Sequence, residues 1–190
     1  MKVISGKYRG RQLVALPGLN TRPTSARVKE DMFNILTNWF IYEGKISLDL
    51  FAGSGALSIE GLSRGIEFAY INDWHNPALE IVKKNLKNIP ASQFQITNWE
   101  FKRVLDYLHQ SKKNVDLIYL DPPFPQVNYY YEFFEKIATL DILAENGVIM
   151  TEAPELLDLS KINHLTLLKY KDFKNKHFYL FRLERQENGQ

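Results

Sequence analysis

Four consecutive residues, Asp121-Pro122-Pro123-Phe124, combine a carboxylate, two prolines and an aromatic ring. They follow an apolar run over Val115–Leu120, which predicts a buried parallel strand. Proline has a fixed φ and no N–H, so the carbonyls of Asp121 and Pro122 are acceptors for which no neighbouring amide competes. Such a loop can hold a planar amino group while the ring stacks on the attached base. The alternative is a turn that only ends the strand, because proline is common in turns.

A glycine-containing turn follows an earlier apolar strand, Ile46–Phe51. In Asp49-Leu50-Phe51-Ala52-Gly53-Ser54-Gly55-Ala56 the two glycines allow a sharp turn and a close approach of the backbone to a ligand. A dinucleotide-binding fingerprint would continue to a third Gly or Ala, where this chain has Ser58. No separate segment remains to form a hydride-acceptor domain, which disfavours a dehydrogenase.

Two polar residues follow the next two predicted strands. Asp73 stands where a doubly wound fold places an acid for ribose hydroxyls, and Asn98 could meet an adenine edge. Alternatively, Asp73 caps the helix that begins near Pro77, and Asn98 is an ordinary loop residue. Together with the glycine turn, these residues predict a nucleoside pocket. S-adenosylmethionine fits it better than a dinucleotide, because this nucleoside carries an amino acid and no pyrophosphate.

The elements that position these residues alternate between apolar strands and helices. Helices are predicted near Ala56–Arg64, Pro77–Asn88, Phe101–His109 and Tyr129–Leu140, between strands over Ile46–Phe51, Phe68–Ile71, Phe94–Ile96, Val115–Leu120 and Val148–Thr151. This alternation is typical of α/β proteins whose parallel sheet is covered on both faces. Leu165–Tyr170 and Phe178–Leu183 are expected to close the chain as a hairpin. The prediction is a mostly parallel seven-stranded sheet with a C-terminal antiparallel hairpin.

The N-terminal region is expected to form a separate small element. Lys2–Ile4 and Gln12–Leu16 flank a bend and predict a β-hairpin. A helix should follow, capped by Thr24 or Ser25, with apolar residues at helical spacing as far as Trp39. We expect one domain over residues 1–190, with residues 1–23 as a basic hairpin extension and residues 24–190 as the core.

The composition excludes several classes of site. The chain of 190 residues has no cysteine, so disulfides, thiolate metal sites and cysteine nucleophiles are excluded. The four histidines, at 75, 109, 164 and 177, show no metal-ligand spacing, and we expect no metal. Neither a signal peptide nor a membrane-spanning run is evident, so a cytoplasmic location is expected.

Positive charge gathers near the N-terminus. Residues 1–30 hold seven Lys and Arg against one acid, Glu30, although the whole chain has a net charge of only +2. A basic end predicts contact with a polyanion, and the alternative is a solvated surface hairpin. An aromatic ring among the basic residues favours nucleic acid. The residues expected to bind RNA are Lys7, Tyr8, Arg9, Arg11 and Arg22.

Four stretches, in this order, resemble the RsmD family of methyltransferases. They are residues 3–13, residues 21–36, residues 50–65 and the Asp121-Pro122-Pro123-Phe124 loop. The resemblance implies a Rossmann-like class I methyltransferase fold. It also implies transfer of a methyl group from S-adenosylmethionine to the exocyclic N2 of a guanine in small-subunit (16S) ribosomal RNA.

The resemblance also implies which residues contact the cofactor. Gly53 and Gly55 would line it, Asp73 would hold its ribose, and Asn98, where the family usually has Asp, would meet its adenine. Thr24, within Arg22-Pro23-Thr24, would lie beside its methionine end. The complete expected set is Asp49, Phe51, Gly53, Ser54, Gly55, Asp73, Asn98, Trp99 and Thr24.

The expected mechanism is an in-line displacement in which positioning supplies much of the rate. Asp121 and the Pro122 carbonyl would accept hydrogen bonds from the guanine amine and stabilise its developing positive charge. Phe124, after Pro123, would stack on the guanine once it leaves its helix or loop.

Two rival functions remain open at this point. The Asp-Pro-Pro-aromatic motif also serves adenine-N6 DNA methyltransferases, although no recognition domain is evident here. A non-catalytic RNA-binding assembly factor is the second rival. The expected partner is ribosomal RNA within an assembled or assembling small subunit, with no DNA or membrane partner, and the expected state is a monomer.

Overall fold

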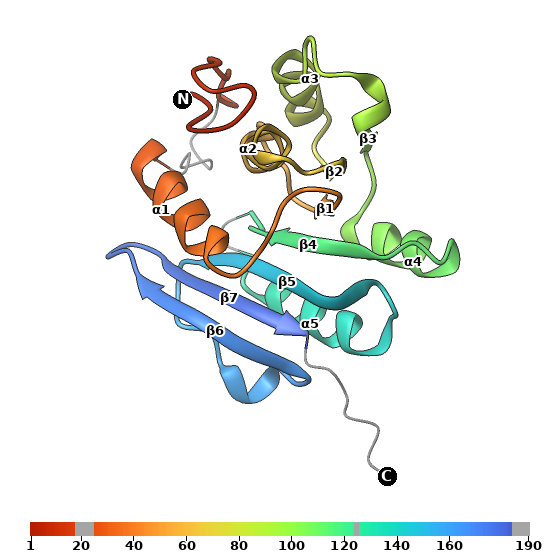
Figure 1. Ribbon diagram of the computed structural model, residues 1–190. Helices are drawn as coiled ribbons and strands as arrows, with labels where there is room; N and C mark the ends of the chain where they lie inside the picture. The colour runs from red at the N-terminus through yellow and green to blue at the C-terminus, as the bar shows by residue number, and fades with distance from the viewer. Residues whose placement is uncertain (18–24, 124–125, 184–190) are drawn as a thin grey trace.

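The computed structural model describes residues 1–17, 25–123 and 126–183. The predicted residues Arg22, Thr24 and Phe124 lie outside these ranges. The described residues form one seven-stranded sheet in the order β3-β2-β1-β4-β5-β7-β6 (Figure 1). The strands are β1 Ile46–Asp49, β2 Phe68–Asn72, β3 Phe94–Thr97, β4 Val115–Leu120, β5 Leu143–Ala153, β6 Leu165–Asp172 and β7 His177–Leu183.

The first five strands are parallel, and β7 runs antiparallel between β5 and β6. This arrangement confirms the predicted mostly parallel sheet with a C-terminal antiparallel hairpin. β4 has the predicted bounds. β1 ends two residues earlier than predicted, at Asp49, and the glycine turn begins there.

Helices cover both faces of the sheet, as expected. They are α1 Ala26–Thr37, α2 Ala56–Arg64, α3 Asn76–Asn85, α4 Phe101–Gln110 and α5 Asn128–Thr139, with short 3₁₀ turns over Ala91–Gln93 and Leu159–Lys161. Side chains of α1, α2 and α3 pack in one core layer, and those of α4 and α5 pack in the other. Side chains along β4 alternate between the layers, because Leu117 and Tyr119 face the first and Ile118 and Leu120 the second.

The first helix begins where it was predicted to begin but ends earlier than expected. Ser25 is the N-cap, and its hydroxyl accepts from the Val28 N–H at 3.2 Å. The helix ends at Thr37, so Trp39 does not belong to its buried face and is 41% exposed. Lys29, by contrast, is fully buried within the helix, which its charge did not predict.

The predicted N-terminal hairpin is reduced to a single antiparallel bridge between Lys2 and Gln12. Around this bridge the Val3 N–H donates to the Arg11 carbonyl at 2.9 Å, and the Leu13 N–H donates to Met1 at 2.7 Å. Residues 1–16 therefore form a compact loop, called here the N-terminal loop. Gly6 has a φ of +91°, and a Cβ there would lie 1.9 Å from the Ser63 carbonyl oxygen of α2. Only glycine permits this close contact.

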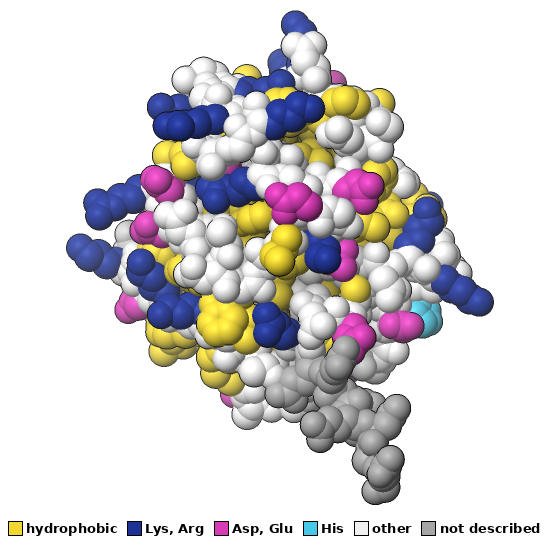
Figure 2. Space-filling view, in the orientation of Figure 1, with side chains coloured by type: hydrophobic (Ala, Val, Ile, Leu, Met, Phe, Trp, Pro, Cys, Tyr) yellow, Lys and Arg dark blue, Asp and Glu magenta, His cyan; other side chains and the backbone are white. Residues whose placement is uncertain are grey.

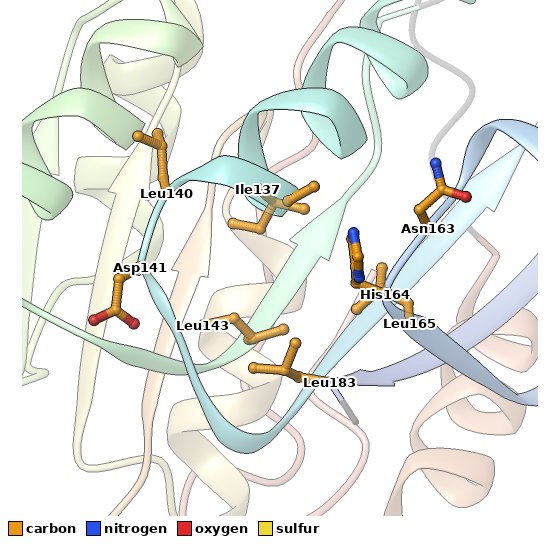
Figure 3. A pocket seen from close by; sticks show the side chains of 9 residues that line it. Ile137, Leu140, Asp141, Leu143, Asn163, His164, Leu165 and Leu183 are labelled. Atoms are coloured by element: carbon orange, nitrogen blue, oxygen red, sulfur yellow. The ribbon is translucent and has the colours of Figure 1, made fainter. Parts of the chain in front are cut away.

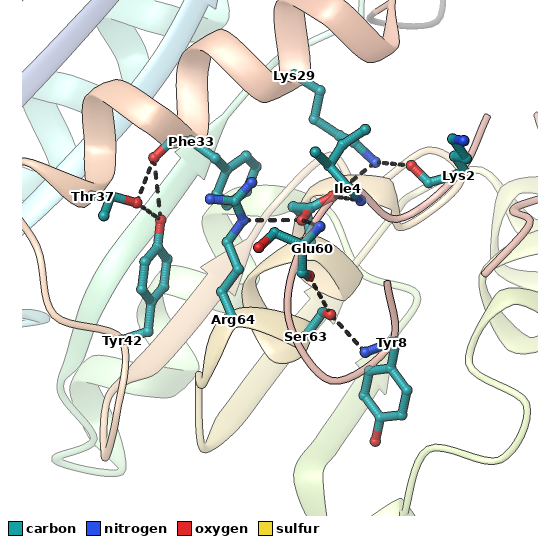
Figure 4. Close-up of polar contacts among 11 residues, drawn as sticks. Lys2, Ile4, Tyr8, Lys29, Phe33, Thr37, Tyr42, Glu60, Ser63 and Arg64 are labelled. Atoms are coloured by element: carbon teal, nitrogen blue, oxygen red, sulfur yellow. Dashed lines mark hydrogen bonds and ion pairs between the residues drawn. The ribbon is translucent and has the colours of Figure 1, made fainter. Parts of the chain in front are cut away.

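A buried ionic cluster attaches the N-terminal loop to the core (Figure 4). The Glu60 carboxylate in α2 accepts from the backbone N–H groups of Ile4 and Ser5, at 2.9 and 3.2 Å. Lys29 lies 3.2 Å and Arg64 3.0 Å from the same carboxylate. Burial lowers the pKa of Lys29, and Glu60 opposes this shift. The cluster thus joins α1, α2 and the N-terminal loop.

Positive side chains gather over the N-terminal loop and α3, at the top of the view in Figure 2. Within the part of the chain that the structure describes, no helix is long and apolar enough to cross a membrane.

Candidate functional site

The predicted polar residues meet at one edge of the sheet. Asp49 is the last residue of β1, Asp73 and Asn98 follow β2 and β3, and Asp121 follows β4. These four strands are adjacent and parallel, so their carboxyl ends lie at the same edge. Ligands of open α/β sheets bind at this edge. We call it the carboxyl edge.

The glycine turn is bound to the end of β2. The Gly53 N–H donates to Asp73 Oδ2 at 2.9 Å, and the Ala52 N–H donates to the Asn72 carbonyl at 2.9 Å. Gly53 has a φ of +59° and Gly55 a φ of +81°, which favour glycine at both positions. A Cβ at Gly53 would meet nothing within 4 Å, so the turn faces open space there. The turn is therefore held in shape while its backbone remains accessible.

Asp73 also accepts from the His75 N–H, at 2.8 Å, so its carboxylate organises the segment that follows β2. Burial raises the pKa of Asp73, and the two amide hydrogen bonds oppose that shift. Asp73 is not the cap of α3, because His75 is the N-cap residue of that helix. The Asp73 carboxylate lies instead at the glycine turn.

The Asn98 side chain has a fixed orientation. Its amide nitrogen donates to the carbonyls of Asp73 and Trp74, at 2.8 and 3.0 Å. Both amide hydrogens are used by these bonds, so only Oδ1 remains to contact a ligand. An aspartate here would place a carboxylate against two carbonyl oxygens. Local geometry therefore explains why this chain has the amide.

Asn72 and Trp74 were missed in the sequence. Asn72 is buried and joins β1, β2 and the turn after β3, because its side chain bonds to Leu50, Thr97 and both backbone groups of Trp99. A polar residue in a buried strand was the available signal. Trp74 is 70% exposed beside Asp73. The signal available in the sequence was an aromatic residue directly after the acid that follows a predicted strand.

Trp99 and Phe51 contribute to packing below the carboxyl edge. The Trp99 ring lies 5.3 Å from Tyr107 of α4, and the Arg103 guanidinium lies 4.4 Å from it. The Phe51 ring stacks on Tyr129 of α5 at 5.8 Å.

Asp49 is buried at the base of the glycine turn. Its carboxylate accepts from the Phe51 N–H and from the Ser58 hydroxyl, each at 3.3 Å. Burial raises the pKa of Asp49 well above its usual range, and the carboxylates of Asp121 and Asp73 raise it further. Ser54 is attached to α3, because its carbonyl accepts from the Asn85 amide at 2.8 Å.

Asp121 lies beside a carboxylate that was not predicted, Glu152 of β5. Burial and Glu152 raise the pKa of Asp121 to about 7, and Lys176 opposes this shift. Glu152 is 2% exposed, and the Lys176 ammonium lies 2.9 Å from it. After Asp121, Pro122 is buried and Pro123 is exposed. Asp121 is thus a carboxyl whose charge changes near neutral pH.

The predicted RNA-binding residues have unequal roles in the N-terminal loop. Lys7 and Arg9 are exposed. Arg11 donates to the carbonyls of Lys87 and Asn85, at 2.6 and 3.4 Å, and lies 4.6 Å from the Tyr8 ring. Arg11 therefore fastens the loop to the end of α3. Of the predicted residues that the structure describes, Lys7 and Arg9 are the exposed charges.

A cavity of about 200 Å³ lies elsewhere, between α5 and the start of β6. Figure 3 shows Ile137, Leu143, His164 and Leu183 around it. None of the predicted site residues lines it. Within the described ranges, no three His, Asp or Glu side chains are arranged to hold a metal ion.

Comparison with known proteins places these features in a family. The family model described as conserved hypothetical protein 95 matches residues 1–182. Ribosomal RNA small subunit methyltransferase D of Haemophilus influenzae is 33% identical over 175 residues, covering 90% of this chain and 88% of that protein. The protein of the same name in Escherichia coli is 31% identical, covering 80% of this chain and 71% of its own length.

A solved structure from Escherichia coli, which carries a provisional methyltransferase name, has the same fold. Its TM-score is 0.81 at 26% identity, and the match covers 98% of this chain and 99% of that one.

Proposed function

Because the chain belongs to the RsmD family, whose model is described as conserved hypothetical protein 95, we propose that it is an S-adenosylmethionine-dependent ribosomal RNA methyltransferase. The proposed target is the exocyclic N2 of a guanine in 16S ribosomal RNA, within an assembled or assembling small subunit. The names of the relatives support the RNA and the subunit. The choice of guanine N2 rests on the resemblance of the sequence motifs to the family.

The residues of the carboxyl edge fit this cofactor. S-adenosylmethionine supplies an electrophilic methyl group on a sulfonium centre. The open backbone at Gly53 and the turn that continues through Gly55 would lie against it, and Asp73 would accept from its ribose hydroxyls. Asn98 Oδ1 would accept from the adenine amino group, since its own amide hydrogens are already bonded.

Asp121 and the Pro122 carbonyl would hold the target amine. Both accept hydrogen bonds, and together they would aim the nitrogen lone pair at the methyl group. An ionised Asp121 would also stabilise the positive charge that develops on the nitrogen. A pKa of about 7 means that the carboxyl ionises as the pH rises through 7, so the rate should rise over the same range. Phe124, outside the described residues, would stack on the guanine.

The N-terminal loop would contact the RNA backbone. Lys7 and Arg9 are exposed on it, and Arg11, which lies against the Tyr8 ring, holds it to the end of α3. Phosphate neutralisation by such side chains makes binding dependent on salt. Arg22, which belongs to the same predicted set, lies outside the described residues.

One observation carries the proposal: the Asp121 loop and the glycine turn end adjacent parallel strands, β4 and β1. A methyl donor in the turn and an amine at Asp121 would therefore meet at one edge of the sheet.

The test offers labelled S-adenosylmethionine with naked 16S ribosomal RNA, small subunits lacking the modification and duplex DNA, then identifies the modified nucleoside. We expect N2-methylguanosine in ribosomal RNA, with small subunits the better substrate. Methyladenine in DNA would overturn the proposal, and absence of transfer to every substrate would favour a non-catalytic RNA-binding role.

A further inference from the structure

Glu152 shares one face of the sheet with Asp121. In the parallel pair of β4 and β5, Leu120 lies opposite Thr151, so the next residues are Asp121 and Glu152. Side chains of paired residues point to the same face. The Leu120 side chain packs against α5, so the residues that follow face the opposite layer, where Phe178, the β7 partner of Glu152, is buried.

Glu152 is held rigidly in this position. Its backbone pairs with Phe178, and its carbonyl accepts a hydrogen bond from the Tyr130 hydroxyl of α5. Thr151 is fixed as well, because its hydroxyl donates to the Leu120 carbonyl. The backbone that carries the Glu152 carboxylate is therefore fixed beside the end of β4.

Lys176 supplies the positive charge at this place. It lies in the turn between β6 and β7, and its ammonium is 2.9 Å from Glu152 Oε2. Its side chain is 28% exposed, so the pair is shielded on one side and reaches solvent on the other.

The charged and titratable groups that act on Asp121 come from four elements. Glu152 of β5 and Asp49 of β1 are acids, Tyr130 of α5 is a phenol, and Lys176 is the cation. Neighbouring carboxylates resist ionising together, because each charge disfavours the other. A lysine on Glu152 removes much of that repulsion.

We propose that Glu152 and Lys176 form a positioning pair that sets the charge of Asp121, and thereby the pH range in which the target amine is held. This inference rests on the proposed function for the role of Asp121. Lys176 neutralises Glu152 and so permits Asp121 to ionise. Glu152 binds Lys176 of the β6–β7 turn and so keeps this cation near Asp121. Its own negative charge opposes the ionisation of Asp121.

Two substitutions with opposite expected effects test the pair. Lys176→Met leaves Glu152 unneutralised, so the midpoint of the acid limb of kcat should rise by about one pH unit, a tenfold loss of rate below it. Glu152→Gln removes a negative neighbour, so the midpoint should fall. A merely structural role would lower kcat in both variants without moving the two midpoints in opposite directions. Lys169→Met, an exposed lysine of β6, is the matched control and should leave the profile unchanged.

A second measurement separates this inference from the proposed function. The Asp121 carboxyl is titrated by ¹³C NMR in the wild-type protein and in both variants, without RNA. Opposite displacements of its midpoint support the pair even if no substrate is methylated, a result that would refute only the proposed function. Displacements in the same direction, or no displacement, would overturn the pair.

Discussion

Two buried carboxylate sites, one at Glu60 and one at Asp121, differ in the partners that surround them. Glu60 accepts from two backbone amides and contacts both Lys29 and Arg64. Asp121 adjoins another acid, Glu152, and among the described residues no donor bonds to its carboxylate. The Glu60 site is complete within the protein and holds elements together. The Asp121 site has acceptor capacity to spare for a donor from outside, such as an amine.

The largest expected effect is a loss of activity when Asp121, the carboxylate without a bonded donor among the described residues, is replaced. Asp121→Ala should lower methyl transfer by about 10³-fold, because it removes an acceptor aimed at developing charge. Single-turnover transfer from labelled cofactor measures this loss. Binding of S-adenosylhomocysteine should change little, and the exposed Asp141→Ala is the matched control. Near wild-type turnover in Asp121→Ala would refute its assignment.

At the Glu60 site a substitution is expected to lower the stability of the fold. Glu60→Gln leaves Lys29 buried without its counter-charge, and breaking one partner of such a pair costs roughly 3–5 kcal/mol. Urea unfolding measures the difference, with the exposed Glu67→Gln as control. A loss below about 1 kcal/mol would show that the cluster does not anchor the N-terminal loop as the contacts indicate.

Removing the charge at Asp121 should raise the free energy of unfolding, whereas removing the charge at Glu60 should lower it. The pKa of Asp121 is raised in the folded protein, so its contribution to stability is present at low pH and is lost as the pH rises through about 7. Asp121→Asn should therefore stabilise the fold more at pH 8 than at pH 4, near the ordinary pKa of aspartate, by roughly 2–4 kcal/mol. Thermal unfolding at the two pH values measures this. Equal effects at both would contradict the raised pKa.

The smallest expected effect is on RNA binding by the basic side chains of the N-terminal loop, which the Glu60 cluster attaches to the core. Arg9→Ala should weaken RNA binding a few-fold and reduce the salt slope by about 0.9, because one phosphate contact is lost. Arg11→Ala should in addition loosen the N-terminal loop, since Arg11 bonds to the end of α3. Filter binding at several salt concentrations separates the two variants. An unchanged slope in Arg9→Ala would remove the loop from the RNA-binding proposal.

The sequence predicted the residues of the carboxyl edge better than their charged neighbours. Strand positions, the glycine turn and Asp121 follow from local patterns, because parallel strands bring their carboxyl ends together wherever the chain continues. Glu152 lies 31 residues beyond Asp121, and Lys176 lies a further 24 residues along the chain, after β6. Their meeting depends on the strand order β4-β5-β7, which no local pattern specifies.

Two further misses have the same physical origin. The burial of Lys29 was not predicted, because lysine is rarely buried without a partner and its partner Glu60 lies in another helix. The N-terminal hairpin was predicted from two short apolar stretches. Its backbone makes only part of its hydrogen bonds within the loop, and the N–H groups of Ile4, Ser5 and Tyr8 bond instead to Glu60 and Ser63.

The attachment of the N-terminal loop has a consequence for the order of events during synthesis. Residues 1–16 leave the ribosome before their partners in α2 and at the end of α3, which lie 55 to 76 positions later in the chain. Contacts over such separations form only after the intervening chain has been ordered. A nascent chain too short to contain α3 therefore lacks both a complete carboxyl edge and the folded surface that presents Lys7 and Arg9.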